Sequence, residues 1–364
     1  MKISEITSYL EGLAPLSSQE SYDNSGLIVG NGNDEVTQVL ISLDCIESTI
    51  DEAIEKGCEL IIAHHPIVFK GLRKLNGTDY VQRTVLKAIK NDIAIYAIHT
   101  NLDNYRFGVN AEIGRRLGLR NLRVLSPKEN VLNKLAVFVP TDHKEKVKEA
   151  LFRSGAGSIG DYRECSFETS GIGTFKPVNN ATPFDGEIDK RNTVSEVRIE
   201  VLVSSHQLRN VISSMKLAHP YEEVAYEVYT IENENQFEGA GMIGDLVKPL
   251  EEFEMLQLIK ETFKCGVIRH TKLRTRKINT IAFCGGSGSF LLRDAIRQKA
   301  DIYITADYKY HEFFDADNRI IIADIGHYES EQYTSDLLAD ILMKKFPTFA
   351  VHLTEVNTNP INYF

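Results

Sequence analysis

Residues 59–68 read ELIIAHHPIV, an apolar run that stops at two adjacent histidines and a proline. The run predicts a buried strand that ends at His64 and His65. Successive strand residues point to opposite faces, so both histidines can face one site only if the chain leaves strand geometry there. Pro66 favours this, because it restricts His65 to extended backbone and cannot continue the ladder. Ten histidines in 364 residues would give about 0.3 adjacent pairs by chance, so the pair gains meaning only from its surroundings.

The composition is that of a globular protein long enough for two or three domains. Its 364 residues are 43% hydrophobic and 25% charged, with a formal net charge of −10. The negative charge disfavours nonspecific binding to nucleic acid and to anionic membranes. The most basic short run, Arg269–Lys277, is typical of a solvated loop or face.

Several features predict a cytoplasmic protein without a membrane anchor. No apolar run reaches the roughly 20 residues that span a bilayer, and the acidic N-terminus lacks the apolar core of a signal peptide. The five cysteines are odd in number and form no Cys-x-x-Cys pair, which argues against a zinc ribbon and a disulfide framework.

The two ends of the chain share a strand–helix alternation that predicts mainly parallel sheets. Residues 1–128 show it, as do residues 235–364. The expected strands are 38–44, 58–65, 93–101, 301–307 and 348–356, together with those that open the stretches 278–289, which ends in a glycine-rich turn, and 319–327, which runs into a helix. Residues 129–234 instead give strand–helix–strand twice, which predicts a ferredoxin-like α+β insert with a long central loop at 171–192.

Metal-ligating residue types follow three of the expected strands. His64 and His65 end the first, His99 and Asp103 lie at the end of the second, and His327 and Glu331 lie just past the third. The carboxyl ends of strands in a parallel α/β sheet share one edge, where sites gather. His327 and Glu331 are four residues apart, so they project from one face of a helix.

These residues predict a metal centre at that edge. Three histidines and two carboxylates exceed the needs of one tetrahedral ion and suit two divalent ions that share a carboxylate. A set of nitrogen and oxygen ligands permits Zn, Mn, Fe or Co. Each residue alone has an ordinary explanation: Asp103 as a turn cap and Glu331 as a first-turn acid. Only their convergence points to a metal.

Three other features can be explained either by structure or by function. The glycine-rich junction CGGSGS (284–289) suits either a tight turn or a phosphate held by backbone amides. Cys284 has no neighbouring base in the sequence and is expected to be a small core residue. The stretch HPYEE (219–223) is expected to form a turn with a local polar network in preference to a second metal site.

The combined motifs resemble the Nif-three-like family, whose members are often catalogued as GTP cyclohydrolase 1 type 2 homologs. The motifs are YDNSGLIVG (22–30), AHHP, HTNLDN, CGGSGS and DIGHYESE (324–331), and the middle segment is similar to the PII/CutA-like insert of longer bacterial members. The resemblance spans nearly the whole chain. One departure is Tyr22, where many members have tryptophan.

The resemblance implies one α/β unit built from both ends of the chain and interrupted by the insert. It implies two divalent ions, Zn first among the candidates, with Glu331 bridging and His99 next to the site without being a ligand. The implied ligands are His64, His65, Asp103, His327 and Glu331. It also implies a toroidal homohexamer.

Two functions from different classes follow as expectations. One is a metal-dependent hydrolase acting on a nucleotide-like or phosphorylated small molecule, with His99 or Glu329 as a candidate proton shuttle. The other is a non-enzymatic metal-binding ring whose insert senses a small molecule. A third, a ring that threads DNA, is disfavoured by the acidic charge unless positive residues line the hole. GTP cyclohydrolase chemistry is implied only by the family's name, since the sequence identifies neither a guanine pocket nor a proton shuttle.

Overall fold

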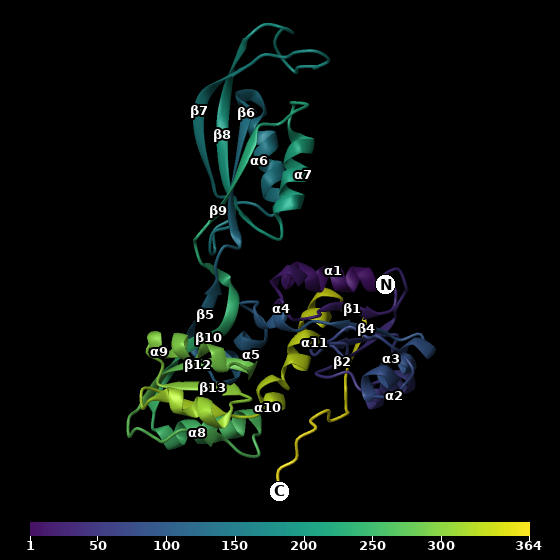
Figure 1. Ribbon diagram of the computed structural model, residues 1–364, viewed down its shortest axis with the longest axis vertical. Helices are drawn as coiled ribbons and strands as arrows, with labels where there is room; N and C mark the ends of the chain where they lie inside the picture. Colours follow the sequence, from purple (N-terminus) through teal and green to yellow (C-terminus); the bar gives the residue numbers. More distant parts are fainter. The chain divides into compact units, whose positions relative to one another are not determined.

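The computed structural model describes residues 1–364 and contains two compact units. Residues 1–127 and 237–364 form the larger unit, and residues 128–236 form the smaller one. Figure 1 shows the elements of each unit, with the two ends of the sequence, purple and yellow, together in the larger unit. Among the helices of both units, none has the length and apolar character needed to cross a membrane.

The first sheet of the larger unit has five strands in the order β1-β4-β3-β2-β15. Its strands are β1 (Gly26–Val29), β2 (Gln38–Ser42), β3 (Leu60–Ala63), β4 (Ala94–Ala97) and β15 (Ala350–Leu353). The last four run parallel, and β1 pairs antiparallel with β4. The accompanying helices are α1 (Ile3–Leu13), α2 (Glu47–Lys56), α3 (Tyr80–Lys90) and α11 (Thr334–Lys345). Strands β3 and β4 are buried along their whole length, which explains their unbroken apolar sequences.

The second sheet has six strands in the order β11-β14-β13-β12-β10-β5. Its strands are β5 (Arg120–Lys128), β10 (Asn235–Leu250), β11 (Arg269–His270), β12 (Ile278–Ser287), β13 (Ile302–Ala306) and β14 (Ile321–Asp324). The three strands β12, β13 and β14 are parallel. The helices of this part are α4 (Thr100–Asp103), α5 (Val109–Arg116), α8 (Glu252–Phe263), α9 (Leu292–Arg297) and α10 (His327–Glu331).

One hydrophobic core joins the two sheets. Ile41 and Ile62 from the first sheet belong to the same buried cluster as Phe283 and Ile304 from the second. The expected α/β unit formed by both ends of the chain is therefore confirmed. One expectation was wrong: the strands that carry the candidate ligands do not all lie in one sheet, because β3 and β4 belong to the first sheet and β14 to the second.

The smaller unit has the expected ferredoxin-like fold. Its elements are β6 (Leu132–Pro140), α6 (Lys144–Arg153), β7 (Ser166–Phe175), β8 (Asn192–Ser204), α7 (Leu208–Ala218) and β9 (Tyr226–Ile231). The four strands form an antiparallel sheet in the order β7-β8-β6-β9. The central loop is shorter than expected, because β7 continues to Phe175, which pairs with Asn192 at the start of β8.

The HPYEE stretch in this unit forms the expected local polar network. The two ring nitrogens of His219 lie 3.0 Å from the carbonyl oxygen of Phe138 and 3.1 Å from the backbone nitrogen of Tyr221. The hydroxyl of Tyr221 donates to Glu196 at 2.8 Å. Both nitrogens of His219 are therefore engaged within the protein.

Candidate metal centre

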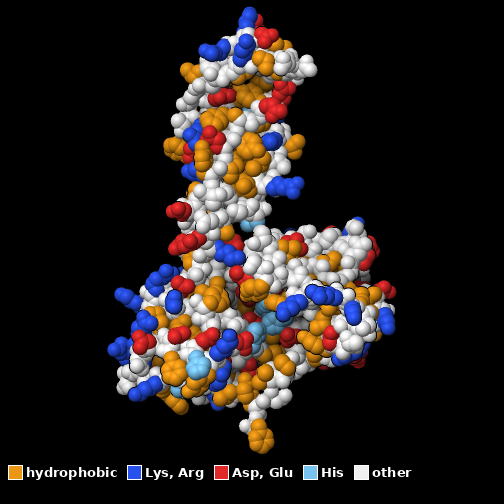
Figure 2. Space-filling view, viewed as in Figure 1, with side chains coloured by type: hydrophobic (Ala, Val, Ile, Leu, Met, Phe, Trp, Pro, Cys, Tyr) orange, Lys and Arg blue, Asp and Glu red, His pale blue; other side chains and the backbone are white.

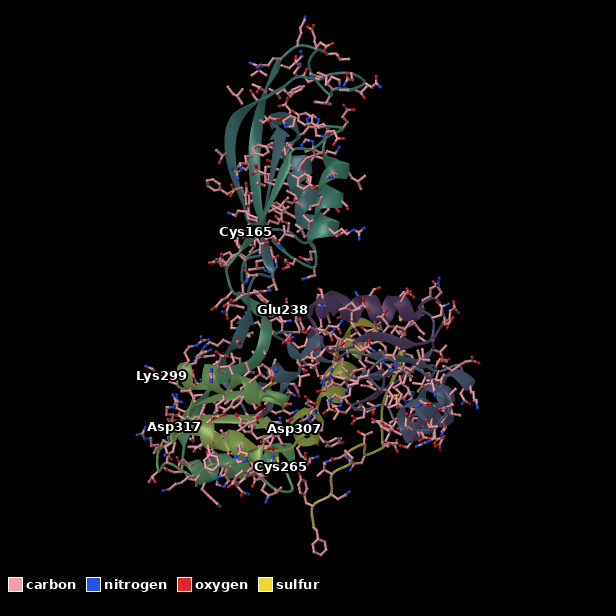
Figure 3. The ribbon with its side chains drawn as sticks, in the orientation of Figure 1. Cys165, Glu238, Cys265, Lys299, Asp307 and Asp317 are labelled. Carbon is pink, nitrogen blue, oxygen red and sulfur yellow. The ribbon has the colours of Figure 1, made fainter.

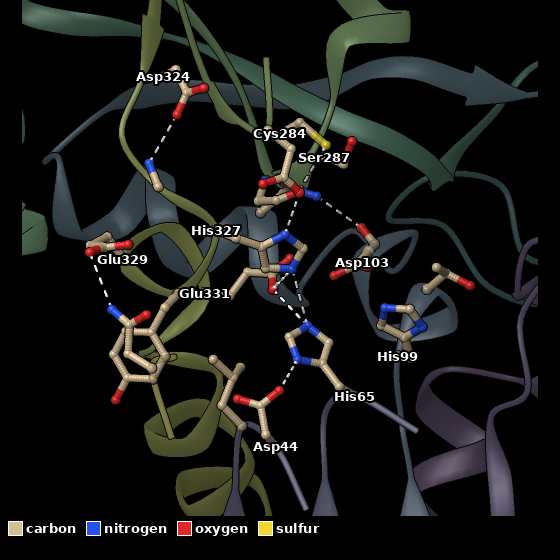
Figure 4. A pocket seen from close by; sticks show the side chains of 18 of the residues that line it. Asp44, His65, His99, Asp103, Cys284, Ser287, Asp324, His327, Glu329 and Glu331 are labelled. Carbon is tan, nitrogen blue, oxygen red and sulfur yellow. Dashed lines mark hydrogen bonds and ion pairs between the residues drawn. The ribbon is translucent and has the colours of Figure 1, made fainter. Parts of the chain in front are cut away.

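The structure brings the candidate ligands together between the two sheets. Strand β3 ends at Ala63, immediately before His64 and His65. The chain leaves the ladder there, as expected at Pro66, and the two imidazole rings lie side by side with centroids 5.0 Å apart. Asp103 ends α4, just beyond β4, and α10 carries His327 and Glu331 across from the first sheet (Figure 4).

The first group of ligand atoms surrounds one oxygen of Glu331. Its Oε2 lies 3.0 Å from His65 Nε2 and 3.1 Å from His327 Nε2, and the two nitrogens are 3.3 Å apart. Ligands at about 2.0–2.1 Å from a tetrahedral zinc ion lie about 3.3 Å from one another. The three atoms are thus spaced as ligands of a single ion.

The second group surrounds the other oxygen of Glu331. His64 Nε2 lies 3.9 Å from Glu331 Oε1 and 3.5 Å from Asp103 Oδ1. Both His64 Nε2 and Asp103 Oδ1 are buried without a hydrogen-bond partner. Buried polar atoms without a partner are costly, and a metal ion would satisfy both. The residues of this group therefore fit a second ion.

Each histidine of the cluster is oriented by a hydrogen bond to its Nδ1 atom. The acceptors are the Ile98 carbonyl for His64 at 2.8 Å, and Asp44 for His65, Asp23 for His99 and Asp307 for His327, each at 2.7 Å. A proton held on Nδ1 leaves the Nε2 lone pair free, which is how acceptors around metal sites fix the ligating nitrogen. Asp307, at the end of β13, lies beside α10 (Figure 3).

Sequence reasoning did not identify these three aspartates as partners of the histidines. A signal was present for two of them, because Asp44 and Asp307 close the predicted strands QVLISLD and DIYITAD at the edge where the ligands gather. Asp44 is further held by the hydroxyl of Thr358, which donates to its other oxygen at 2.7 Å.

His99 and Glu329, the two candidate proton shuttles, occupy different places. Ligand atoms of His64, His65 and His99 all lie within 4.8 Å of one another, so His99 adjoins the cluster. Glu329 is buried on the same helix as the candidate ligands His327 and Glu331, but the hydrogen bond to its carboxylate comes from the Asn359 amide at 3.4 Å. Its side chain points away from His327 and Glu331 (Figure 4).

The electrostatics of the cluster favour a cation at its centre. Burial opposes charge on His65 and His327, yet Asp44 and Glu331 raise the pKa of His65 to about 9, and Glu331 and Asp307 raise the pKa of His327 to about 11. Burial lowers the pKa of His64 to about 3. Burial and the charge of Glu331 raise the pKa of Asp103 well above its usual value. The carboxylates that attract protons here would equally attract a metal ion.

The glycine-rich junction makes room for Glu331. A Cβ on Gly286, which has a φ of +60°, would lie 2.4 Å from Glu331 Oε1. The amides of Gly285 and Gly286 donate to Asn110 Oδ1 and Ser330 Oγ at 3.0 and 2.9 Å. Of the two alternatives for CGGSGS, these bonds favour the tight turn, since neither amide is free for a phosphate. Cys284 is buried and its thiol pKa is raised by burial, as expected for a core residue.

A cavity of about 750 Å³ adjoins the cluster. The candidate ligands His65, Asp103, His327 and Glu331 form part of its wall. Aromatic side chains contribute apolar surface, among them Tyr22, Phe69, Phe290, Tyr328 and Tyr363. Figure 2 shows histidine side chains at the surface of the larger unit, with acidic and hydrophobic side chains around them. The cavity has the size and mixed lining typical of small-molecule sites.

Zinc binding is expected to displace at least two protons per chain at pH 7, because the raised pKa values of His65 and His327 favour their protonated forms and both must be neutral to bind. A proton on Asp103, whose pKa is also raised, would add to this count. The apparent affinity for zinc should therefore rise with pH as these groups lose their protons. Calorimetric titration of chelator-treated protein with zinc, in buffers of different ionisation enthalpy, measures the proton count. Binding without proton release would contradict the assigned ligands.

Comparisons with known proteins agree over the full chain. Residues 1–360 match the family Duf34/NIF3 (NGG1p interacting factor 3). A Halalkalibacterium halodurans protein named GTP cyclohydrolase 1 type 2 homolog is 38% identical over 97% of this chain and 96% of its own, and the Bacillus subtilis protein of that name is 36% identical over 99% and 98%. The crystal structure of a Bacillus cereus protein related to NIF3 superposes with a TM-score of 0.87 at 36% identity, covering 100% of this chain and 99% of the other. The chain therefore belongs to the Duf34/NIF3 family.

Proposed function

We propose that the cluster binds two divalent ions and that the protein is a metal-dependent hydrolase of a nucleotide-like or phosphorylated small molecule. The position of Glu331 carries this proposal. Its carboxylate is only 3% exposed, and its two oxygens face two different groups of ligand atoms. A buried carboxylate between two such groups is the arrangement expected of a ligand that bridges two ions.

The donor set suits Zn, and also Fe, Mn or Co. His65 and His327 would hold one ion and His64 and Asp103 the other, with Glu331 shared between them. When bound, such a pair of ions supplies Lewis acidity and a water that ionises near neutral pH. The set contains no thiolate, since Cys284, the cysteine on the cavity wall, is buried and protonated.

The surroundings of His99 support a role for it in moving a proton at the site. His99 lines the cavity, and Asp23 accepts the hydrogen bond from its Nδ1. This bond leaves the Nε2 lone pair of His99 free, and the centre of its ring lies 5.2 Å from that of His64 and 5.4 Å from that of His65. Bonds from His99 and Thr100 outweigh the effect of burial and hold the pKa of Asp23 below its usual value. An ionised Asp23 would stabilise His99 while it carries an extra proton.

Two observations support the substrate class. The cavity beside the ligands is large enough for a small molecule, and its aromatic wall suits a flat ring. Curated relatives carry the name GTP cyclohydrolase 1 type 2 homolog, which refers to a nucleotide.

Metabolite profiling tests the proposal. Protein purified with its native metals is incubated with a cell extract and with a panel of nucleotides, phosphoesters and cyclic amides, beside the His64→Ala, Glu331→Ala double variant. We expect at least one metabolite to be consumed only by the intact protein. Two bound ions without any turnover would instead favour the non-enzymatic metal-binding function.

A further inference from the structure

We propose that Arg269 binds a phosphate group of the molecule that occupies the cavity. This inference rests on the proposed function and deepens it, because it states where the charged end of the substrate lies. The phosphate would sit at Arg269 while the reacting part of the molecule reaches the ligand cluster.

The charge of the cavity wall singles out Arg269. Seven carboxylates line the cavity: Glu20, Asp44, Asp103, Asp307, Asp324, Glu329 and Glu331. Arg269 is the only lysine or arginine among the lining residues. Two divalent ions would offset much of the negative charge at one end of the cavity. A fixed cation elsewhere on the wall then gives a phosphorylated molecule a second, separate point of attachment.

Arg269 is held by one nitrogen and presents the others. Its Nη2 donates both to Asp324 Oδ2 and to the Tyr308 carbonyl, whereas Nε and Nη1 have no acceptor in the protein. The side chain is 53% exposed, and the guanidinium lies 5.5 Å from the ring centre of Phe313. A planar guanidinium anchored at one corner keeps its remaining N–H groups in a fixed fork that matches a phosphate.

Asp324 does not need Arg269 to satisfy its buried carboxylate. Asp324 is 4% exposed and also accepts bonds from the backbone amides of Tyr308 at 2.9 Å and Gly326 at 3.2 Å. Its carboxylate therefore has buried donors without Arg269. The arrangement makes Asp324 a support that fixes the direction of the guanidinium.

The position of Arg269 places it near the metal ligands without making it one of them. Arg269 in β11 pairs with Asp324 at the end of β14, three residues before His327. The hydrogen bond from His327 is the main cause of the lowered pKa of Asp307, and the charge of Arg269 contributes. The glycine-rich junction offers no competing phosphate site through Gly285 and Gly286, whose amides are bound within the protein.

Calorimetric titration of the zinc-loaded protein with inorganic phosphate tests this assignment. Arg269→Gln should weaken phosphate binding at least tenfold. Arg269→Lys should weaken it less, because it keeps the charge and loses the fork. All variants should hold as much zinc as the unmodified protein.

Lys277→Gln is the matched control, because Lys277 belongs to the same basic run, is 67% exposed and does not line the cavity. It should leave phosphate affinity unchanged. Unchanged affinity in zinc-loaded Arg269→Gln, or no binding of millimolar phosphate by the unmodified protein, would overturn the inference. Failure of the proposed function would appear separately, as absent zinc or absent turnover.

Discussion

Glu331→Ala should lower the metal content from about two ions per chain to close to none, because it removes the one carboxylate that contacts both groups of ligands. Removing a side chain that binds only one ion would leave the other ion in place. Loss of both ions therefore indicates that Glu331 binds both. Elemental analysis after dialysis against metal-free buffer measures the content, and circular dichroism checks that the variant is folded.

Glu329→Ala provides the control on the same helix. Glu329 is also buried, but its carboxylate bonds with Asn359 and lies outside the ligand groups. This variant should retain both ions. Two ions remaining in Glu331→Ala, or equal loss in the two variants, would show that Glu331 does not bridge.

Gly286→Ala should disrupt the same centre without changing any ligand. Its φ of +60° is strained for alanine by about 1–2 kcal/mol, and the new Cβ would lie 2.4 Å from Glu331 Oε1. The carboxylate must then move from between the two groups. We expect a lower melting temperature and the loss of at least one ion, measured by calorimetry and elemental analysis.

The matched substitution is Gly12→Ala in α1, where a Cβ would meet nothing within 4 Å. Alanine favours a helix interior over glycine by about 0.5–1 kcal/mol, so this variant should be as stable or more stable and keep its ions. Full metal content in Gly286→Ala would mean that the close approach to Glu331 is not required for binding.

The fold could be predicted to the level of its class, because apolar runs of strand length alternate with amphipathic helices at both ends of the chain. The middle segment showed a different order of elements, and its sheet has the ferredoxin-like order. The distribution of strands between two sheets could not be predicted. Buried parallel strands such as β3 and β14 have similar apolar sequences. Such sequences do not indicate which strands pair by hydrogen bonds.

The place of each candidate ligand at a strand end or on one helical face followed from elementary geometry, but their meeting between two different sheets did not. Residues that come directly after buried strands, such as His64, are carried to a sheet edge, and the spacing of His327 and Glu331 places both on one helical face. The carboxylates that accept hydrogen bonds from the histidines could not be predicted in this way. Asp23 and His99 are 76 residues apart and meet only through tertiary packing. The same holds for Arg269, whose basic run gave no sign that one of its members lines a cavity.

Anomalous diffraction from crystals of the protein purified with its native metals tests the bridging role of Glu331 most directly. We predict two peaks per chain, one among His65, His327 and Glu331 and the other among His64, Asp103 and Glu331. A single peak, peaks at other residues, or none at all would contradict a shared carboxylate at the centre of the site.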